Sequence, residues 1–230
     1  MLGSKARYAG LGLSVLLSLS SAALAAGKGK PKTARRAPAA SYRAHVQKWH
    51  TRLPDASAPL DASGRPKLVL EAINTGVRVE LSADTDTGGF AEAERIRASE
   101  ALRDAKKNRA SAVNEKLLNL LYRLQRHFDA PAVRVVSAFR AGGRSEHARG
   151  TAADIVLPGV ADSELAAHAR SFGGGVGLYP TSGFVHVDVR SEPHYWVDSS
   201  GPGQKSKARA RTAPDAQENR ASARPNPHGG

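Results

Sequence analysis

Two histidines and an aspartate are spaced in a way that favours metal binding. His147 lies in the charged, glycine-containing segment 145–150, Asp154 follows seven residues later, and His186 lies further on in an apolar segment. Two imidazoles and one carboxylate suit zinc, with a fourth position open for water. Bound zinc lowers the pKa of such a water to about 7 and polarises a scissile carbonyl. We therefore predict a hydrolytic Zn2+ site formed by His147, Asp154 and His186.

The chain has no cysteine, which excludes a structural site made of thiolates. An octahedral oxygen site for calcium or magnesium fits two histidines poorly.

The segment 184–189 reads as a strand, and its side chains should alternate between two faces. The valines would then share a buried face, while His186 and Asp188 point together to the other face. A buried histidine held by a carboxylate without metal remains an alternative for this strand taken by itself. The upstream His147 and Asp154 favour the metal.

The elements that would position these residues are three helices and a set of short strands. Apolar alternation predicts a hairpin of strands 67–72 and 77–81 around the turn Asn74-Thr75-Gly76. Helical spacing predicts helices at 91–107 and 113–127, and a third helix at 162–172 with Asp162 or Ser163 as its N-cap. Further strands are expected at 133–136, 152–157, 176–178 and 184–189. This order favours an α+β fold with a small antiparallel sheet and helices packed on one side.

Both ends of the chain differ from the segment between them. Residues 1–25 read as a signal peptide, with a basic start, a short apolar stretch and Ala23-Leu24-Ala25 as the cleavage site. An uncleaved anchor is the alternative. Residues 26–40 are expected to be a basic linker, 41–198 the folded domain and 199–230 a disordered basic tail. These features predict export to the periplasm or cell envelope.

The net charge of +13 belongs to these ends, because residues 41–198 carry 21 basic and 19 acidic side chains. A specific nucleic-acid-binding protein should carry its basic patch on the fold itself, so none is expected here. The basic tails could bind anionic envelope polymers, or could simply aid solubility.

The residues 145–154 match the pattern S-x-H-x-x-G-x-A-x-D and resemble the zinc D-Ala-D-Ala carboxypeptidases and dipeptidases. That superfamily also includes lysostaphin-type and hedgehog-type domains. The likeness is strongest to its YcbK-like (MepK-like) branch of murein endopeptidases and extends from Trp49 to Trp196. The segments that carry it are Asn74-Thr75-Gly76, Ser137-Ala138-Phe139-Arg140, 174–188 and Tyr195-Trp196.

The resemblance implies that His147, Asp154 and His186 are the zinc ligands. It also implies that Arg140 contacts the substrate or the developing oxyanion, although a surface arginine at a strand end is the alternative. Ser145 would support the ligand loop.

One position departs from the pattern of the superfamily. Many relatives have a catalytic acid three residues before the second histidine, where this chain has Gly183. A general base is therefore sought elsewhere, with Asp188 first, followed by His194 and Glu192. Asp188 could instead orient His186.

The implied function is that of an exported zinc metallopeptidase, a monomer that hydrolyses amide bonds in peptidoglycan stem peptides or cross-links. It would act as a murein endopeptidase or carboxypeptidase. The absence of an acid at Gly183 supports an alternative, a catalytically inactive zinc-containing peptidoglycan-binding module. A polyanion-binding protein that acts through its tails is a third reading.

Overall fold

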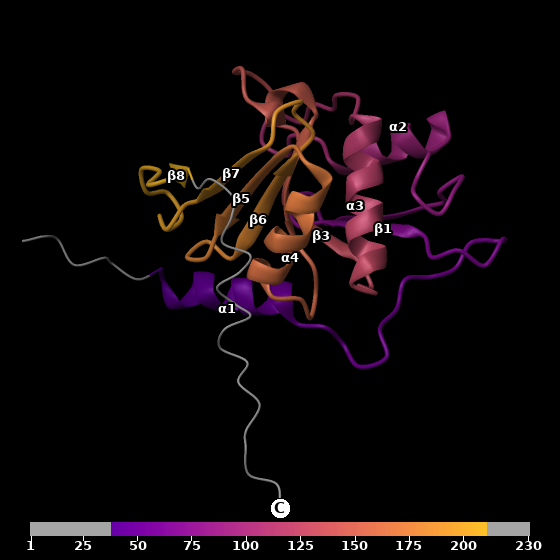
Figure 1. Ribbon diagram of the computed structural model, residues 1–230, viewed down its shortest axis with the longest axis horizontal. Coiled ribbons are helices and arrows are strands. Elements are labelled where there is room, and N and C mark those ends of the chain that lie inside the picture. Colours follow the sequence, from indigo (N-terminus) through magenta and orange to yellow (C-terminus); the bar gives the residue numbers. More distant parts are fainter. Residues whose placement is uncertain (1–37, 211–230) are drawn as a thin grey trace, which may run out of the picture. The chain divides into compact units, whose positions relative to one another are not determined.

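Alternating apolar residues build one eight-stranded sheet in the computed structural model, which describes residues 38–210 (Figure 1). The strands are β1 (Leu68–Ala72), β2 (Val77–Leu81), β3 (Val133–Ser137), β4 (Ala152–Val156), β5 (Gly175–Tyr179), β6 (Phe184–Asp188), β7 (His194–Val197) and β8 (Arg209–Ala210). Their order in the sheet is β2-β1-β3-β4-β6-β5-β7-β8. The predicted hairpin of β1 and β2 is confirmed, with Leu68 opposite Leu81 and Ala72 opposite Val77.

The α+β class is confirmed, but the prediction of a small antiparallel sheet is wrong. The pairs β1–β3 and β5–β7 are parallel, and the remaining neighbours are antiparallel. A parallel pair requires a long connection, and β2 with two helices provides one between β1 and β3. The alternation within a strand does not reveal which distant strand will lie beside it.

One face of the sheet is the apolar core. Every second strand residue points to this face, and the fully buried ones include Leu70, Val133, Ile155 and Val185. They pack against α2 (Glu92–Ala101), α3 (Glu115–His127) and α4 (Asp162–Ala169). Because side chains alternate along a strand, the other face is left for the polar residues of the candidate site.

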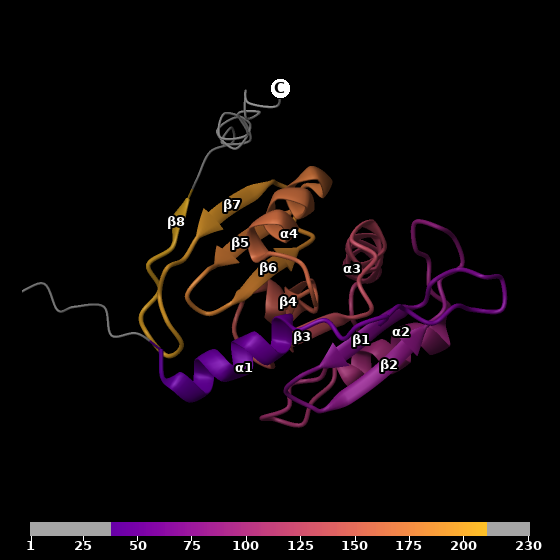
Figure 2. The same cartoon turned by 90° about the horizontal axis from the view of Figure 1, so that it is seen from below.

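Helix α1 (Ala40–His50) was not predicted, and it lies against the opposite face. It has no buried residue, so no apolar stripe marks it in the sequence. The guanidinium of Arg134, which alternates with the core residues of β3, donates to three main-chain carbonyls at the end of α1, at 2.7 to 3.0 Å. His50 Nε2 also lies 3.0 Å from Asp162 Oδ1. The expected one-sided packing therefore applies to α2, α3 and α4, which Figure 2 shows apart from α1.

Two helices end earlier than predicted. Helix α2 ends at Ala101, because the Asp104 carboxylate binds the main-chain N–H groups of Lys106 and Lys107 and closes a turn. Helix α4 ends at Ala169 and continues as a 3-10 turn, Arg170–Phe172. Its N-cap is Ala161 rather than Asp162 or Ser163, since Asp162 is the first helical residue and binds His50.

The chain after residue 198 is ordered further than expected. Asp198 is buried and accepts hydrogen bonds from the main-chain N–H groups of Ser200 and Lys207 and from the Ser206 hydroxyl. This cluster leads the chain into β8, which pairs with β7. Residues 199–210 therefore depart from the predicted disordered tail. The predicted signal peptide, nearly all of the linker, and residues 211–230 lie outside the described residues. Within residues 38–210, no helix is long and apolar enough to cross a membrane.

Candidate active site

Strand pairing brings Asp154 and His186 together. Asp154 on β4 lies directly opposite His186 on β6, and Asp154 Oδ1 is 2.9 Å from His186 Nδ1. His147 lies on the 3-10 turn Glu146–Arg149, which Ser145 caps by accepting from the Ala148 N–H. Its Nε2 is 3.3 Å from Asp154 Oδ1 and 3.2 Å from His186 Nδ1. The structure thus gathers all three predicted ligands, each at most 7% exposed.

Gly150 ends the turn that carries His147. Its φ is 72°, and a Cβ there would lie 2.6 Å from the carbonyl oxygen of Ala112. Only glycine accommodates both the backbone conformation and this close approach. The glycine of the motif therefore sets the position of the His147 turn.

Each histidine has one ring nitrogen fixed from outside the cluster. His147 Nδ1 lies 2.6 Å from the carbonyl oxygen of Ala138, which can only accept, so this nitrogen carries the proton. His186 Nε2 lies 3.1 Å from Asp188 Oδ2 and donates in the same way. In the neutral rings, the two inner nitrogens then present lone pairs to each other across 3.2 Å. A cation bound between them and Asp154 removes this repulsion, so the donor set fits a metal ion.

The electrostatics of the cluster favour an ionised Asp154. Burial by itself would raise the pKa of Asp154, but hydrogen bonds and charge interactions with His147 and His186 hold it well below its usual range. Burial would likewise lower the pKa of His186, but hydrogen bonds to Asp154 and Asp188 outweigh burial and raise it. The buried carboxylates therefore favour positive charge at this point.

Asp188 lies behind His186, and hydrogen-bond donors surround its carboxylate. The side chain is fully buried and accepts from the main-chain N–H groups of Gly175 (3.0 Å) and Arg190 (3.1 Å). The Arg190 guanidinium binds both carboxylate oxygens, at 2.5 to 3.0 Å. Burial tends to raise the pKa of Asp188, but the bonds from His186 and Arg190 hold it well below the usual range. This geometry favours the reading in which Asp188 orients His186.

Two glycines of β5 make room on the site face. A Cβ at Gly175 would lie 2.2 Å from Asp188 Oδ2, and a Cβ at Gly177 would lie 2.4 Å from the Trp196 indole. The Trp196 ring therefore lies over Gly177 of β5, with its centroid 5.1 Å from that of His186. Its Nε1 donates to the Tyr179 hydroxyl at 3.0 Å. A glycine-rich strand thus lets an aromatic wall approach the predicted metal ligands.

The cluster opens into a depression of about 370 Å³. It is lined by His147, Asp154 and His186 and by the aromatic residues Tyr179, Phe184 and Trp196. The rings of Tyr179 and Phe184 stack at 4.6 Å. Tyr179 and Trp196 thus line the groove beside the site.

Arg140 lies at the rim of this depression, and its side chain is 53% exposed. Its guanidinium binds Asp154 Oδ2, while its Nε donates to the Ser137 hydroxyl at 2.8 Å. The structure therefore places Arg140 beside the ligand carboxylate rather than on an unrelated surface.

The other candidate bases differ in position. His194 is exposed on the site face of β7, and its ring lies 5.4 Å from that of Trp196. Glu192 is exposed in the loop before it. At Gly183, φ is 70° and a Cβ would lie 2.3 Å from Val46 Cγ1 of α1. The side-chain direction at 183 is thus toward α1, and Val46 is no part of the site depression.

Arg190 is a site residue that the sequence analysis missed. It neutralises Asp188 and lines the depression together with His186. The alternation that pairs His186 with Asp188 extends to position 190, so the signal was present two residues further on.

Comparison of the sequence with known proteins agrees with these observations. Residues 61–195 match the family described as peptidoglycan L,D-endopeptidase MepK. The Escherichia coli K12 protein of that name is 28% identical over 160 residues, which cover 62% of this chain and 87% of the relative. A probable peptidoglycan L,D-endopeptidase MepK of Haemophilus influenzae is 28% identical over 156 residues, covering 60% of this chain and 83% of the relative. No solved structure matches.

The matched segment includes His147, Asp154 and His186 together with Tyr179 and Phe184, and it ends one residue before Trp196. The predicted resemblance and the predicted class, a peptidoglycan-hydrolysing peptidase, are confirmed. The chain belongs to the peptidoglycan L,D-endopeptidase MepK family.

Proposed function

We propose that this protein is an exported zinc-dependent endopeptidase that cleaves an L,D amide bond in peptidoglycan peptides. The bond type is that in the names of its relatives. The observation that carries the proposal is the convergence of His147 Nε2, His186 Nδ1 and Asp154 Oδ1 to within 3.3 Å of one another, while Ala138 and Asp188 hold the outer ring nitrogens. Zinc accepts such a donor set, and when bound it activates water and polarises the carbonyl.

The roles of the residues follow from their contacts. His147, Asp154 and His186 hold the metal, and Asp188 fixes the ring of His186 through Nε2. Arg140 keeps a positive charge at the rim, where it stabilises negative charge that develops on the substrate oxygen.

The proton acceptor is assigned by the exposure of the candidate side chains to solvent. Asp188 is buried and fully bonded, and Glu146, which lines the depression, is tied to Arg149 and Thr151. His194 is exposed on the site face beside Trp196, so we assign proton transfer to His194. Glu192 is the next candidate.

The bonding of the acids at the depression also fits the non-catalytic alternative, which is therefore tested as well. Both acids that line the depression, Asp154 and Glu146, are engaged by neighbouring side chains. A metal-containing module that binds peptidoglycan without cutting it would have this arrangement as well.

One digestion separates the two. Purified protein is incubated with peptidoglycan sacculi, with and without chelator, beside His194→Gln and Glu192→Gln, and the released peptides are identified by mass. We expect cleavage at an L,D bond, its loss with chelator and recovery with zinc, and a rate at least tenfold lower for His194→Gln than for Glu192→Gln. Sacculi left intact by protein that holds one zinc would support the binding module. Cleavage that persists in chelator would contradict the zinc mechanism.

The remaining proposals concern the location of the protein, its oligomeric state and the partners of its basic ends. Export to the periplasm or envelope and attachment of the basic ends to anionic envelope polymers are consistent with the basic composition of both ends. A monomeric state is a separate proposal. Secretion of a fusion of residues 1–40 to a reporter enzyme tests the first of these.

A further inference from the structure

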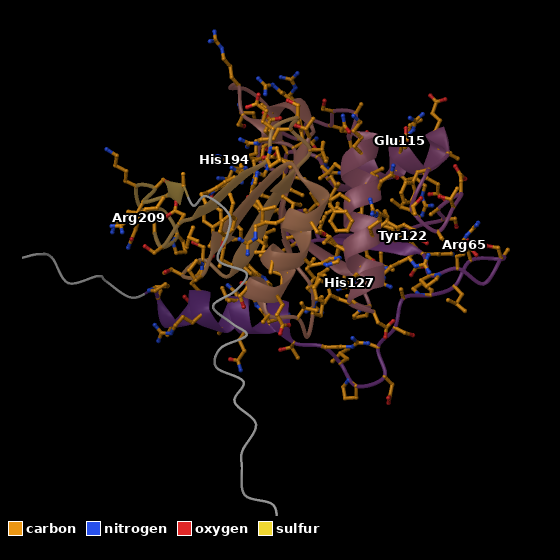
Figure 3. The ribbon with its side chains drawn as sticks, viewed as in Figure 1. Arg65, Glu115, Tyr122, His127, His194 and Arg209 are labelled. Atoms are coloured by element: carbon orange, nitrogen blue, oxygen red, sulfur yellow. The ribbon has the colours of Figure 1, made fainter. Side chains whose placement is uncertain are left out.

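A second depression, of about 520 Å³, lies beside the candidate active site. Helix α3 contributes Lys116, Asn119 and Arg123 to it, three residues that share one face of the helix because they are three and four positions apart. The opposite wall is formed by the turn before β5, at Gly174, and the segment after β6, at Arg190. We call this depression the Lys116 pocket. In Figure 3 the start of α3, marked by Glu115, and the start of β7, marked by His194, both lie in the upper part of the view.

The Lys116 pocket carries excess positive charge. Within residues 38–210, neither the Lys116 ammonium nor the Arg123 guanidinium forms an ion pair, whereas Arg126 on the same helix binds Asp86 at 2.9 Å. Arg123 lies 4.2 Å from the centre of the Phe172 ring, which holds it in place. Among the described residues that line the pocket, Asp188 is the single acid, and Arg190 already neutralises it. Two cations are therefore left for an anion from outside the chain.

The polar groups of the pocket are suited to a carboxylate. The amide oxygen of Asn119 accepts from the Gly89 N–H at 2.8 Å, which leaves the NH2 group of Asn119 as a donor. A carboxylate accepts such bonds, and bonds to a charged partner are stronger than bonds between neutral groups.

Arg190 connects this pocket to the candidate active site, because it lines both depressions. Its guanidinium binds Asp188, and Asp188 binds His186, which is a predicted metal ligand. A peptide held at the metal centre and extended past Arg190 would thus place its next acidic group near Lys116 and Arg123.

We propose that the Lys116 pocket is a substrate subsite that binds a free carboxylate of an acidic peptide stem through Lys116 and Arg123. This proposal rests on the proposed function, since the peptide is taken to be the substrate. It adds a specificity: stems with free carboxylates bind better than stems whose carboxylates are converted to carboxamides.

The test measures binding and cleavage separately. The probes are an uncleavable stem-peptide analogue with free carboxylates and the same analogue with carboxamides, titrated by calorimetry into the zinc-loaded full-length protein. The variants are Lys116→Gln, Arg123→Gln and the double variant. Lys48→Gln is the matched control, because Lys48 is an exposed lysine on α1 that forms no ion pair with any residue of the described segment. Both pocket side chains are exposed, so the melting temperatures should match that of the wild type.

We expect each single variant to bind the free-carboxylate probe about 3- to 10-fold more weakly, as for exposed charge-assisted contacts. The carboxamide probe should bind all variants equally, and the double variant should no longer distinguish the probes. Equal discrimination by the double variant and Lys48→Gln would overturn the subsite. So would variants that lose binding of polyphosphate while they bind the peptide normally, because the pocket would then serve a phosphate polymer.

The two proposals fail in different ways. If the wild type prefers the free-carboxylate probe through Lys116 but cuts no peptidoglycan, the subsite stands and the peptidase proposal falls. If it cuts peptidoglycan and Lys116→Gln changes neither affinity nor KM, the peptidase stands and the subsite falls.

Discussion

Replacement of Asp188 by asparagine separates an orienting role from a proton-accepting role. The substitution keeps the shape of the side chain but removes its charge, and one oxygen becomes an NH2 group. In the wild type, the Asp188 carboxylate accepts from the main-chain N–H groups of Gly175 and Arg190, from the Arg190 guanidinium and from His186 Nε2, at 2.5 to 3.1 Å. Wherever the new NH2 group points, it meets another donor.

The expected cost follows from burial. Removal of one partner of a fully buried ion pair costs about 3–5 kcal/mol, and the one-third exposure of Arg190 reduces this to about 2–4 kcal/mol of unfolding free energy. His186 also loses the acceptor that fixes its ring. Loss of such an outer partner weakens metal binding by about 10- to 100-fold.

The matched control is Asp198→Asn. Asp198 is also buried, at 2% exposure, and accepts from Ser200, Ser206 and Lys207, but it contacts no metal-type ligand. This control should lose about 1–3 kcal/mol of unfolding free energy and keep its metal affinity.

Zinc affinity is measured by competition with a chromophoric chelator, and stability by urea unfolding of the metal-free protein. The orienting role predicts weaker zinc binding in Asp188→Asn, with activity partly recovered at saturating zinc. If Asp188→Asn binds zinc as tightly as the wild type while its kcat falls more than 100-fold, Asp188 is the proton acceptor and our reasoning is refuted.

Two further predictions concern positions around the site and the helices. Gly183→Glu should lower the unfolding free energy by about 2–4 kcal/mol without raising activity, because φ is 70° and the new Cβ meets Val46. The control Gly64→Ala, at a position with φ 80° and open space, should lose only about 1 kcal/mol of unfolding free energy. A Gly183→Glu variant with higher activity would contradict the geometry. His168 stacks on His127 at 3.4 Å, and its pKa is lowered from 6.5 by burial first and then by the charges of His127 and Arg123. A histidine whose pKa is depressed by folding contributes stability that is present above the unfolded value and lost as the pH falls below it. His127→Gln should therefore lose less stability than the wild type between pH 7.5 and pH 5 in urea unfolding, and parallel pH profiles would exclude this coupling.

The sequence by itself predicted that His147, Asp154 and His186 belong together, and the structure brings them together. Period-2 alternation placed His186 and Asp188 on one face of a strand, and the motif around Gly150 placed His147 near Asp154. Alternation and tight turns are properties of a few consecutive residues, so they can be predicted without knowledge of the rest of the chain. The β1–β2 hairpin was predictable for the same reason.

Only the tertiary structure decided what each of these residues can do. The parallel strand pairs, the packing of α1 across the free face and the addition of β8 depend on contacts between segments far apart in the sequence. The choice between an orienting and a proton-accepting Asp188 depends on Gly175, thirteen residues before it, and on the Arg190 guanidinium folded back onto it. Burial and hydrogen-bond saturation are properties of the assembled neighbourhood, and they decide the chemistry of a carboxylate whose position the sequence already indicates.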